Sequence, residues 1–136
     1  MIVVDASALS AFILKEPGWE ALSKYLTHST SVDHVVKEVS NAIWKAYKVR
    51  NLIGKDIAIK LYKILKSMIN TNVILEPEEV FMDKAFEIAL ETGLTVYDSL
   101  YVALALERKL PLLTLDERQG KVAKEMGIEV VMPHQP

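Results

Sequence analysis

The sequence contains no cysteine and only three histidines among its 136 residues. Without cysteine the chain can form no disulfide framework, zinc knuckle or thiol nucleophile. The histidines His28, His34 and His134 lack the i, i+4 spacing of a helical metal site, so we expect them to be ordinary surface or loop residues. These absences exclude thiol chemistry and histidine-based zinc sites.

Long apolar runs are missing as well. No run approaches the ~20 residues of a membrane-spanning helix, and the apolar stretch Met1–Val4 is too short for a signal peptide and lacks a basic start. Hydrophobic residues make up 51% of the chain, enough for a core, and the length fits a single domain over residues 1–136. The net charge of −2 does not indicate a nucleic-acid binder, unless metal ions and local lysines face the phosphates. We expect a soluble cytoplasmic protein.

Short apolar runs rich in β-branched residues alternate with longer segments of helical periodicity. The predicted strands are Ile2–Val4, Ser31–Val32, Val73–Leu75, Leu112–Thr114 and Glu129–Val131. The predicted helices are Ala8–Leu14, Trp19–Leu26, Val35–Arg50, Lys55–Met68, Val80–Thr92, Tyr97–Arg108 and Glu117–Met126, with Gly93, Pro111 and Gly127 near their ends. This alternation predicts an α/β sandwich with a parallel sheet, in which ligands bind beyond the carboxyl ends of the strands.

Four acidic residues occupy suggestive places in this scheme. Asp5 directly follows the first strand, and Asp116 follows the Leu112–Thr114 strand by two residues. Asp98 begins an apolar helix, and Glu38 lies near the start of the helix after the second strand. Each side chain can therefore reach the same rim of the sheet.

Each acid taken alone also has a structural explanation. Asp5 and Asp116 could cap the helices that follow them, and Thr95–Asp98 matches a capping box. Glu38 borders an apolar arc and could be a solvated helix residue. Taken together, four acids in one cleft would repel one another and raise their pKa values. Mg²⁺ or Mn²⁺, which prefer carboxylate and water oxygens, would relieve that repulsion and could activate water against a phosphodiester.

Four segments resemble those of PIN-domain ribonucleases, in particular the VapC-type toxins of toxin–antitoxin pairs. They are Ile2-Val-Val-Asp-Ala-Ser7, Glu38-Val-Ser-Asn41, Tyr97-Asp-Ser-Leu-Tyr-Val-Ala-Leu-Ala105 and Leu113-Thr-Leu-Asp116. Their order and spacing cover nearly the whole chain, and the Tyr-Asp-Ser-Leu-Tyr and Thr-Leu-Asp segments are the most specific.

The resemblance implies a PIN fold, a three-layer α/β/α sandwich with a parallel sheet of about five strands. It also implies RNA cleavage with Mg²⁺ or Mn²⁺ to leave a 5′-phosphate, a homodimer, and an antitoxin that binds near the cleft. Its acidic metal site would consist of Asp5, Glu38, Asp98 and Asp116, with Asp5 and Asp98 as direct ligands. Three accompanying polar residues would orient ligands or waters around the metal: Ser7, Asn41 and Thr114. Ser7 could instead cap a helix.

Several residues outside these segments bear on the prediction. The family often has an apolar residue or proline where this chain has Asp33 and His34; Asp33 would cap the following helix or add a fifth acid. Trp44 lies off the apolar arc of its helix, so we predict it at a protein interface, with Tyr47 and Tyr62 nearby, or else covering a local groove of the same chain. Three lysines near the predicted site could steer phosphates or simply be solvated: Lys15, Lys37 and Lys45. We expect the Met132–Pro136 tail to be a loose segment without function.

Other functions fit the residues less well. A phosphatase of the haloacid-dehalogenase type would need a second Asp two residues after Asp5, where this chain has Ser7. A phosphotransfer receiver would need an acidic pair beside the first strand and a later strand-end lysine, and neither is evident. A PIN nuclease of RNA processing and a non-catalytic PIN-like RNA-binding module remain as alternatives.

Overall fold

The computed structural model describes residues 1–133, which form a single parallel sheet with helices on both faces. The strand order is β3-β2-β1-β4-β5, and all neighbouring strands pair in parallel. The strands are β1 (Ile2–Val4), β2 (Ser29–Val32), β3 (Val73–Glu76), β4 (Leu112–Leu113) and β5 (Val130–Val131). All five predicted strands are present and the predicted α/β class is confirmed. The predicted tail lies outside the described residues from position 134 onward.

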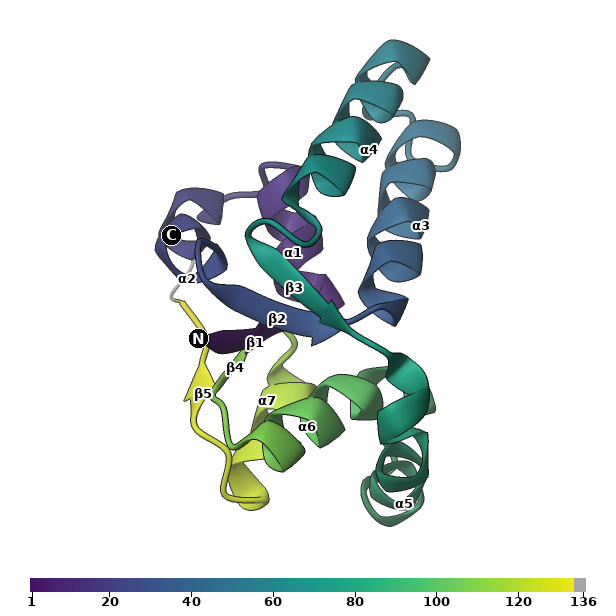
Figure 1. Ribbon diagram of the computed structural model, residues 1–136. Helices are drawn as coiled ribbons and strands as arrows, with labels where there is room; N and C mark the ends of the chain where they lie inside the picture. The colour runs from purple at the N-terminus through teal and green to yellow at the C-terminus, as the bar shows by residue number, and fades with distance from the viewer. Residues whose placement is uncertain (134–136) are drawn as a thin grey trace.

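The helices form the two outer layers of the sandwich (Figure 1). One face of the sheet carries α1 (Ala6–Ile13), α2 (Ser23–Leu26), α3 (His34–Lys48) and α4 (Lys55–Met68). The other carries α6 (Val96–Arg108) and α7 (Glu117–Glu125), with α5 (Met82–Thr92) packed on α6. Two 3-10 helices, η1 (Trp19–Leu22) and η2 (Glu78–Phe81), precede α2 and α5. The predicted three-layer α/β/α sandwich is therefore confirmed.

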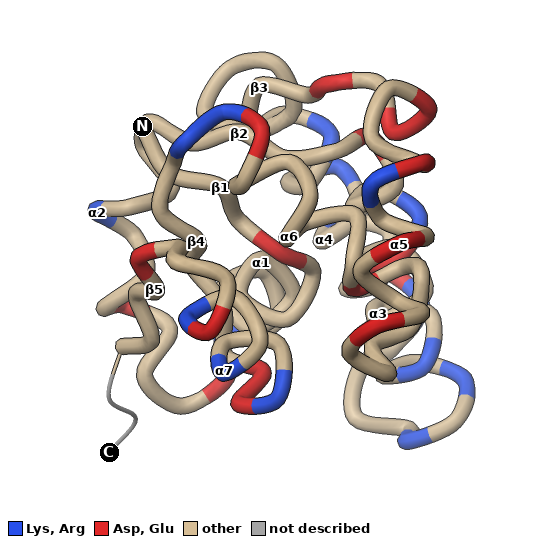
Figure 2. Tube along the Cα trace, turned by 90° about the horizontal axis from the view of Figure 1, so that it is seen from below, with Lys and Arg blue, Asp and Glu red and all other residues tan. Residues whose placement is uncertain are grey.

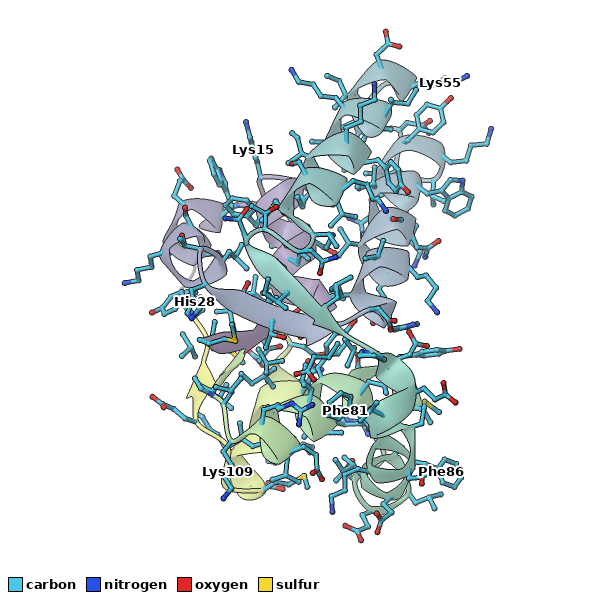
Figure 3. All side chains as sticks on the ribbon, in the orientation of Figure 1. Lys15, His28, Lys55, Phe81, Phe86 and Lys109 are labelled. Atoms are coloured by element: carbon cyan, nitrogen blue, oxygen red, sulfur yellow. The ribbon has the colours of Figure 1, made fainter. Side chains whose placement is uncertain are left out.

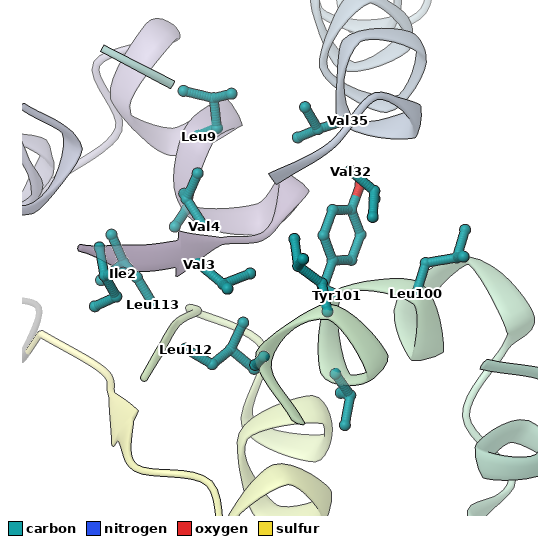
Figure 4. Packing of buried hydrophobic residues seen from close by; sticks show 14 of the residues in the cluster. Ile2, Val3, Val4, Leu9, Val32, Val35, Leu100, Tyr101, Leu112 and Leu113 are labelled. Atoms are coloured by element: carbon teal, nitrogen blue, oxygen red, sulfur yellow. The ribbon is translucent and has the colours of Figure 1, made fainter. Parts of the chain in front are cut away.

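The core lies between the sheet and the two helical layers. The segment Leu100–Ala105 of α6 is buried throughout, because the sheet covers one side of this helix and α5 and α7 cover others. Tyr101, 1% exposed, extends from α6 between Val32 and Val35 toward the start of α3 (Figure 4). This side chain crosses from one layer to the other at the carboxyl ends of the strands.

Strand β2 is buried despite three consecutive hydroxyl residues. Each hydroxyl donates to a backbone carbonyl: Ser29 to Leu26 at 3.1 Å, Thr30 to Ile74 at 2.7 Å and Ser31 to Val4 at 2.7 Å. Buried hydroxyls are tolerated when they are hydrogen-bonded in this way. The predicted strand Ser31–Val32 was therefore too short, because a polar sequence lies in a buried strand.

Some predicted helix boundaries and contacts differ from those observed. The segment Trp19–Leu26 is a 3-10 turn followed by a short α-helix. Asp33 precedes α3, but the prediction that it caps this helix was wrong, because its side chain bonds no α3 amide. Its Oδ1 instead accepts from the Glu78 N–H at 3.0 Å, at the start of η2. Gly93 ends α5 with φ of 80°, a left-handed conformation that favours glycine.

Within residues 1–133, no helix has both the length and the apolar character required to cross a membrane.

Candidate active site

All four predicted acids line one pocket of about 610 Å³ at the carboxyl ends of the strands. Asp5 follows β1, Asp116 follows β4, Glu38 lies on α3, and Asp98 lies in the first turn of α6. Ser7 and Asn41 also line the pocket. Acidic and basic segments are otherwise interspersed over the molecule (Figure 2). The pocket therefore concentrates carboxylates where parallel α/β sheets bind ligands.

Asp5 is the most deeply buried member of this group, with only 2% of its surface exposed. Its carboxylate accepts from the Ala8 N–H at 2.9 Å, so it is the N-cap of α1. It also accepts from the Ser7 hydroxyl at 2.7 Å and from the Thr114 hydroxyl at 2.6 Å. Burial raises the pKa of Asp5 from 3.8 to about 6 although these hydrogen bonds lower it. The carboxylate is therefore held in one orientation at an electrostatic cost.

Asp116 likewise acts as an N-cap, in this case for α7. Its Oδ1 accepts from the backbone N–H of Arg118 at 3.0 Å and of Gln119 at 3.1 Å. The Asp116 N–H in turn donates to the Thr114 hydroxyl at 3.0 Å, and the same hydroxyl donates to Asp5. Thr114, which has no exposed surface, therefore fixes Asp5 and Asp116 relative to each other.

Glu38 is oriented by a residue on the opposite layer of the sandwich. The Tyr101 hydroxyl donates to Glu38 Oε1 at 2.6 Å, and His34 Nε2 lies 3.5 Å from the same oxygen. Burial and the negative charge of Glu38 raise the pKa of Tyr101, so its hydroxyl stays protonated and acts as a donor. Glu38 is therefore a positioned acid rather than a freely solvated one.

Asp98 interacts electrostatically with two of the other acids. Its backbone N–H donates to the Thr95 hydroxyl at 3.1 Å, the first half of the predicted capping box. Burial raises the pKa of Asp98, and the negative charges of Asp116 and Glu38 raise it further. The acids therefore interact electrostatically across the pocket, as expected for uncompensated carboxylates.

The polar and basic residues predicted around the acids differ in whether they line the pocket. Ser7 does not cap a helix; its hydroxyl donates to Asp5 and accepts from the Leu115 N–H at 2.9 Å. Asn41 lines the pocket wall, whereas Asp33 does not line the pocket. Of the predicted lysines, Lys37 and Lys45 line it, joined by Arg50. Lys15 instead lies over the Trp19 ring at 5.6 Å.

Two buried residues of the site were missed in the sequence. Tyr101 looked like one apolar member of a core helix, and Gln119 like an ordinary helix residue. Gln119 has no exposed surface, and its side-chain amide donates to the Asp98 carbonyl at 3.1 Å. A tyrosine inside an apolar run was the available signal, since a buried tyrosine hydroxyl usually needs a partner.

The carboxylates suit a hard divalent cation by their chemistry. Among residues 1–133, no lysine or arginine forms an ion pair with any of the four acids; the one basic side chain beside them is the His34 imidazole, 3.5 Å from Glu38. The same residues contain no group of three or more acids and histidines already arranged to hold a metal ion. Oxygen donors without cationic partners fit Mg²⁺ or Mn²⁺, and loading would require the carboxylates to move closer together.

The chain is similar to known proteins of one family. The PIN domain family model matches residues 2–125. Ribonuclease VapC3 of Pyrobaculum aerophilum is 35% identical over 86% of this chain and 90% of its own length. Exonuclease VapC9 of the same organism is 28% identical over 96% of this chain and 92% of its own length. The crystal structure of Pyrobaculum aerophilum PAE2754 superposes with a TM-score of 0.68 at 28% identity, over 96% of this chain and 88% of that one. The chain therefore belongs to the PIN-domain family and, within it, to the VapC group.

Proposed function

We propose that this protein is a Mg²⁺- or Mn²⁺-dependent endoribonuclease and the toxin of a VapBC-type pair, acting as a single PIN domain over residues 1–136. The observation that carries the proposal is the group of four carboxylates that line one pocket without a lysine or arginine partner among the described residues. The ribonuclease name of the VapC3 relative supports RNA as the substrate.

Asp5 and Asp98 would hold the metal, together with Glu38 and Asp116. The bound ion would activate water and neutralise charge on the phosphate. The chain's own residues prepare this site in advance. Ser7 and Thr114 donate to Asp5, and both hydrogen bonds favour its ionised, metal-binding form.

The two remaining acids are held from different elements. Tyr101 fixes Glu38 on the α3 side of the pocket, while the amides of α7 fix Asp116 on the β4 side. Asn41 is a polar group on the pocket wall that would orient water or a phosphate oxygen. These contacts give each acid a defined orientation, and binding of a metal ion would then need only to draw the carboxylates closer together.

Cleavage of RNA in the presence of Mg²⁺ or Mn²⁺ tests this function, with Asp5→Asn and Asp98→Asn compared against wild type. Asp33→Asn is the matched control, because Asp33 is an exposed acid outside the pocket. We expect wild type and the control to cleave and both site variants to lose at least ~100-fold in rate. Full activity of both site variants, or no cleavage by wild type with either metal, would refute the mechanism.

A circular RNA separates internal from terminal cleavage, since only an endonuclease can open it. This comparison matters because the VapC9 relative is named an exonuclease. Products carrying a 5′-phosphate are expected. Binding of RNA without any cleavage would indicate the non-catalytic module, and cleavage without an inhibitory partner would favour the RNA-processing role.

The proposed partners are a cognate antitoxin and a second copy of the chain. Trp44 on α3 is 52% exposed and Tyr62 on the neighbouring helix α4 is 44% exposed, so both side chains are available for an interface. Large exposed aromatics are frequent anchors of protein interfaces. A small antitoxin encoded next to this protein, which binds and inhibits it, is the expected observation for the toxin role.

A further inference from the structure

Tyr97 is a large aromatic side chain that remains exposed at the active-site pocket. It lies in the first turn of α6, directly before Asp98, and 59% of its surface is accessible. The residue lines the same pocket as the four acids. Neither the metal site nor the core therefore accounts for this ring.

The ring of Tyr97 is held in place by a stacked histidine. Its plane lies 10° from that of His34, with the ring centroids 4.9 Å apart. His34 is only 8% exposed, and its two nitrogens face Glu38 Oε1 at 3.5 Å and Glu78 Oε2 at 3.9 Å. His34 is buried with a glutamate beside each ring nitrogen, so it supports one face of Tyr97, while the 59% exposure of Tyr97 leaves the rest of the ring accessible.

The remaining lining of the pocket suits a chain of phosphates. Lys37, Lys45 and Arg50 line it together with the acids, although none of them pairs with an acid of the metal site. Cationic side chains contact nucleic-acid backbones, while aromatic faces stack on unpaired bases. The pocket therefore offers a stacking surface, cationic groups and a metal site within reach of one short strand.

We infer that Tyr97 is the stacking platform for an unpaired nucleobase next to the phosphate that is cleaved. The inference rests on the proposed function, because it takes single-stranded RNA as the ligand. Bases within a duplex already stack on their neighbours, so a single exposed ring selects unpaired nucleotides. Tyr97 acts by binding and positioning the substrate, and it takes no part in proton transfer.

Equilibrium binding in EDTA tests the platform without cleavage. The probes are a short fluorescein-labelled oligoadenylate and an abasic oligomer of the same length, and the readout is fluorescence anisotropy. The variants are Tyr97→Ala, Tyr97→Trp and, as a control, Phe86→Ala. Phe86 is 55% exposed on α5, points away from the body of the molecule (Figure 3) and does not line the pocket.

Tyr97→Ala should weaken oligoadenylate binding by roughly 5- to 100-fold, the range for loss of one stacked base. Tyr97→Trp and Phe86→Ala should bind as wild type does. The abasic oligomer should bind equally to wild type and Tyr97→Ala. Equal oligoadenylate affinity of Tyr97→Ala and wild type overturns the inference, as does an equal loss for both probes. The thermal midpoint of each variant confirms that it is folded.

Kinetics separate failure of this inference from failure of the proposed function. With an RNA that wild type cleaves, Tyr97→Ala should raise KM by a similar factor and leave kcat within about twofold, since substrate binding is what the ring provides. Unchanged KM with normal cleavage refutes the platform alone. Absence of cleavage by wild type, with Tyr97-dependent oligoadenylate binding intact, refutes the nuclease function alone.

Discussion

Replacement of Asp5 by asparagine should make the protein more stable at neutral and alkaline pH while abolishing its activity. Burial raises the pKa of Asp5 from 3.8 to about 6 in the folded state, and one pKa unit corresponds to ~1.4 kcal/mol. The difference of about two units therefore amounts to about 3 kcal/mol. Because the folded protein binds the Asp5 proton more tightly than the unfolded chain, stability falls as pH rises from about 4 to about 6.

The asparagine variant does not carry this electrostatic cost. It keeps an acceptor for the Ala8 N–H, and the Ser7 and Thr114 hydroxyls can reorient toward its amide. At pH 8 in EDTA we expect Asp5→Asn to exceed wild type by about 3 kcal/mol in free energy of unfolding, or roughly 10 °C in Tm. At pH 4 the difference should fall below about 1 kcal/mol, since wild-type Asp5 is then protonated in the folded state.

Urea denaturation at the two pH values measures this difference, with Asp33→Asn as the exposed-acid control. Taking the difference between variant and wild type cancels the titration of the other acids. If Asp5→Asn is no more stable than wild type at pH 8, the assignment of an electrostatic cost to this carboxylate is wrong. Addition of Mg²⁺ should stabilise wild type and have little effect on the variant, because ligand binding stabilises only the form that binds.

Three further substitutions probe separate contacts. Tyr101→Phe removes the hydroxyl that donates to Glu38. In a cleavage assay at saturating RNA it should lower kcat by ~10- to 100-fold, as expected for loss of one hydrogen bond to a charged group. Trp44→Lys should convert the proposed dimer to a monomer, as measured by light scattering. The Tm should stay nearly unchanged, because the Trp44 side chain is half exposed. A dimer that persists would exclude Trp44 from the interface. Asp33→Ala removes the acceptor of the Glu78 N–H and should lower the free energy of unfolding by ~1 kcal/mol. It should still cleave RNA at the wild-type rate, and a loss of activity would mean that Asp33 belongs to the site.

The fold was largely predictable, because hydrophobic periodicity and helix-end residues indicate where most helices and strands lie. Helix α4 begins and ends at the predicted residues, Lys55 and Met68, and its preceding glycine and amphipathic pattern explain why. Strand β2 was only half predicted, because its serines and threonine satisfy their hydroxyls on neighbouring strands and on the preceding turn. The partners of Thr30 and Ser31 lie 44 and 27 residues away along the chain, and local sequence patterns do not contain them.

The four acids that line the pocket were predicted from their position after predicted strands and at helix starts, and from the family resemblance. The residues that orient them were predictable only in part. Thr114 was expected beside the metal ligands, but its simultaneous bonds to Asp5 and to the Asp116 N–H depend on the pairing of β1 with β4. Asp33 was assigned by a rule of local capping, whereas its actual partner lies 45 residues along the chain. Long-range partners of this kind become visible only when the strands are assembled.

Two of the four acids have a second role as helix caps, and this affects how relatives of the protein can be interpreted. Asp5 begins α1 and Asp116 begins α7, so a side chain that cannot cap would forfeit ~1 kcal/mol of capping stability at either position, apart from any loss of activity. A descendant that had given up catalysis would still be under selection for a capping side chain at both positions, but asparagine at position 5 would keep the cap without the electrostatic cost of the buried carboxylate. Among residues 1–133 neither the Glu38 nor the Asp98 side chain caps a helix, but Glu38 still accepts from the buried Tyr101 hydroxyl, so Asp98 has the weakest structural reason to be kept. Retention of Asp98, and of aspartate rather than asparagine at position 5, is therefore the more informative mark of a working nuclease among PIN-domain proteins of this kind.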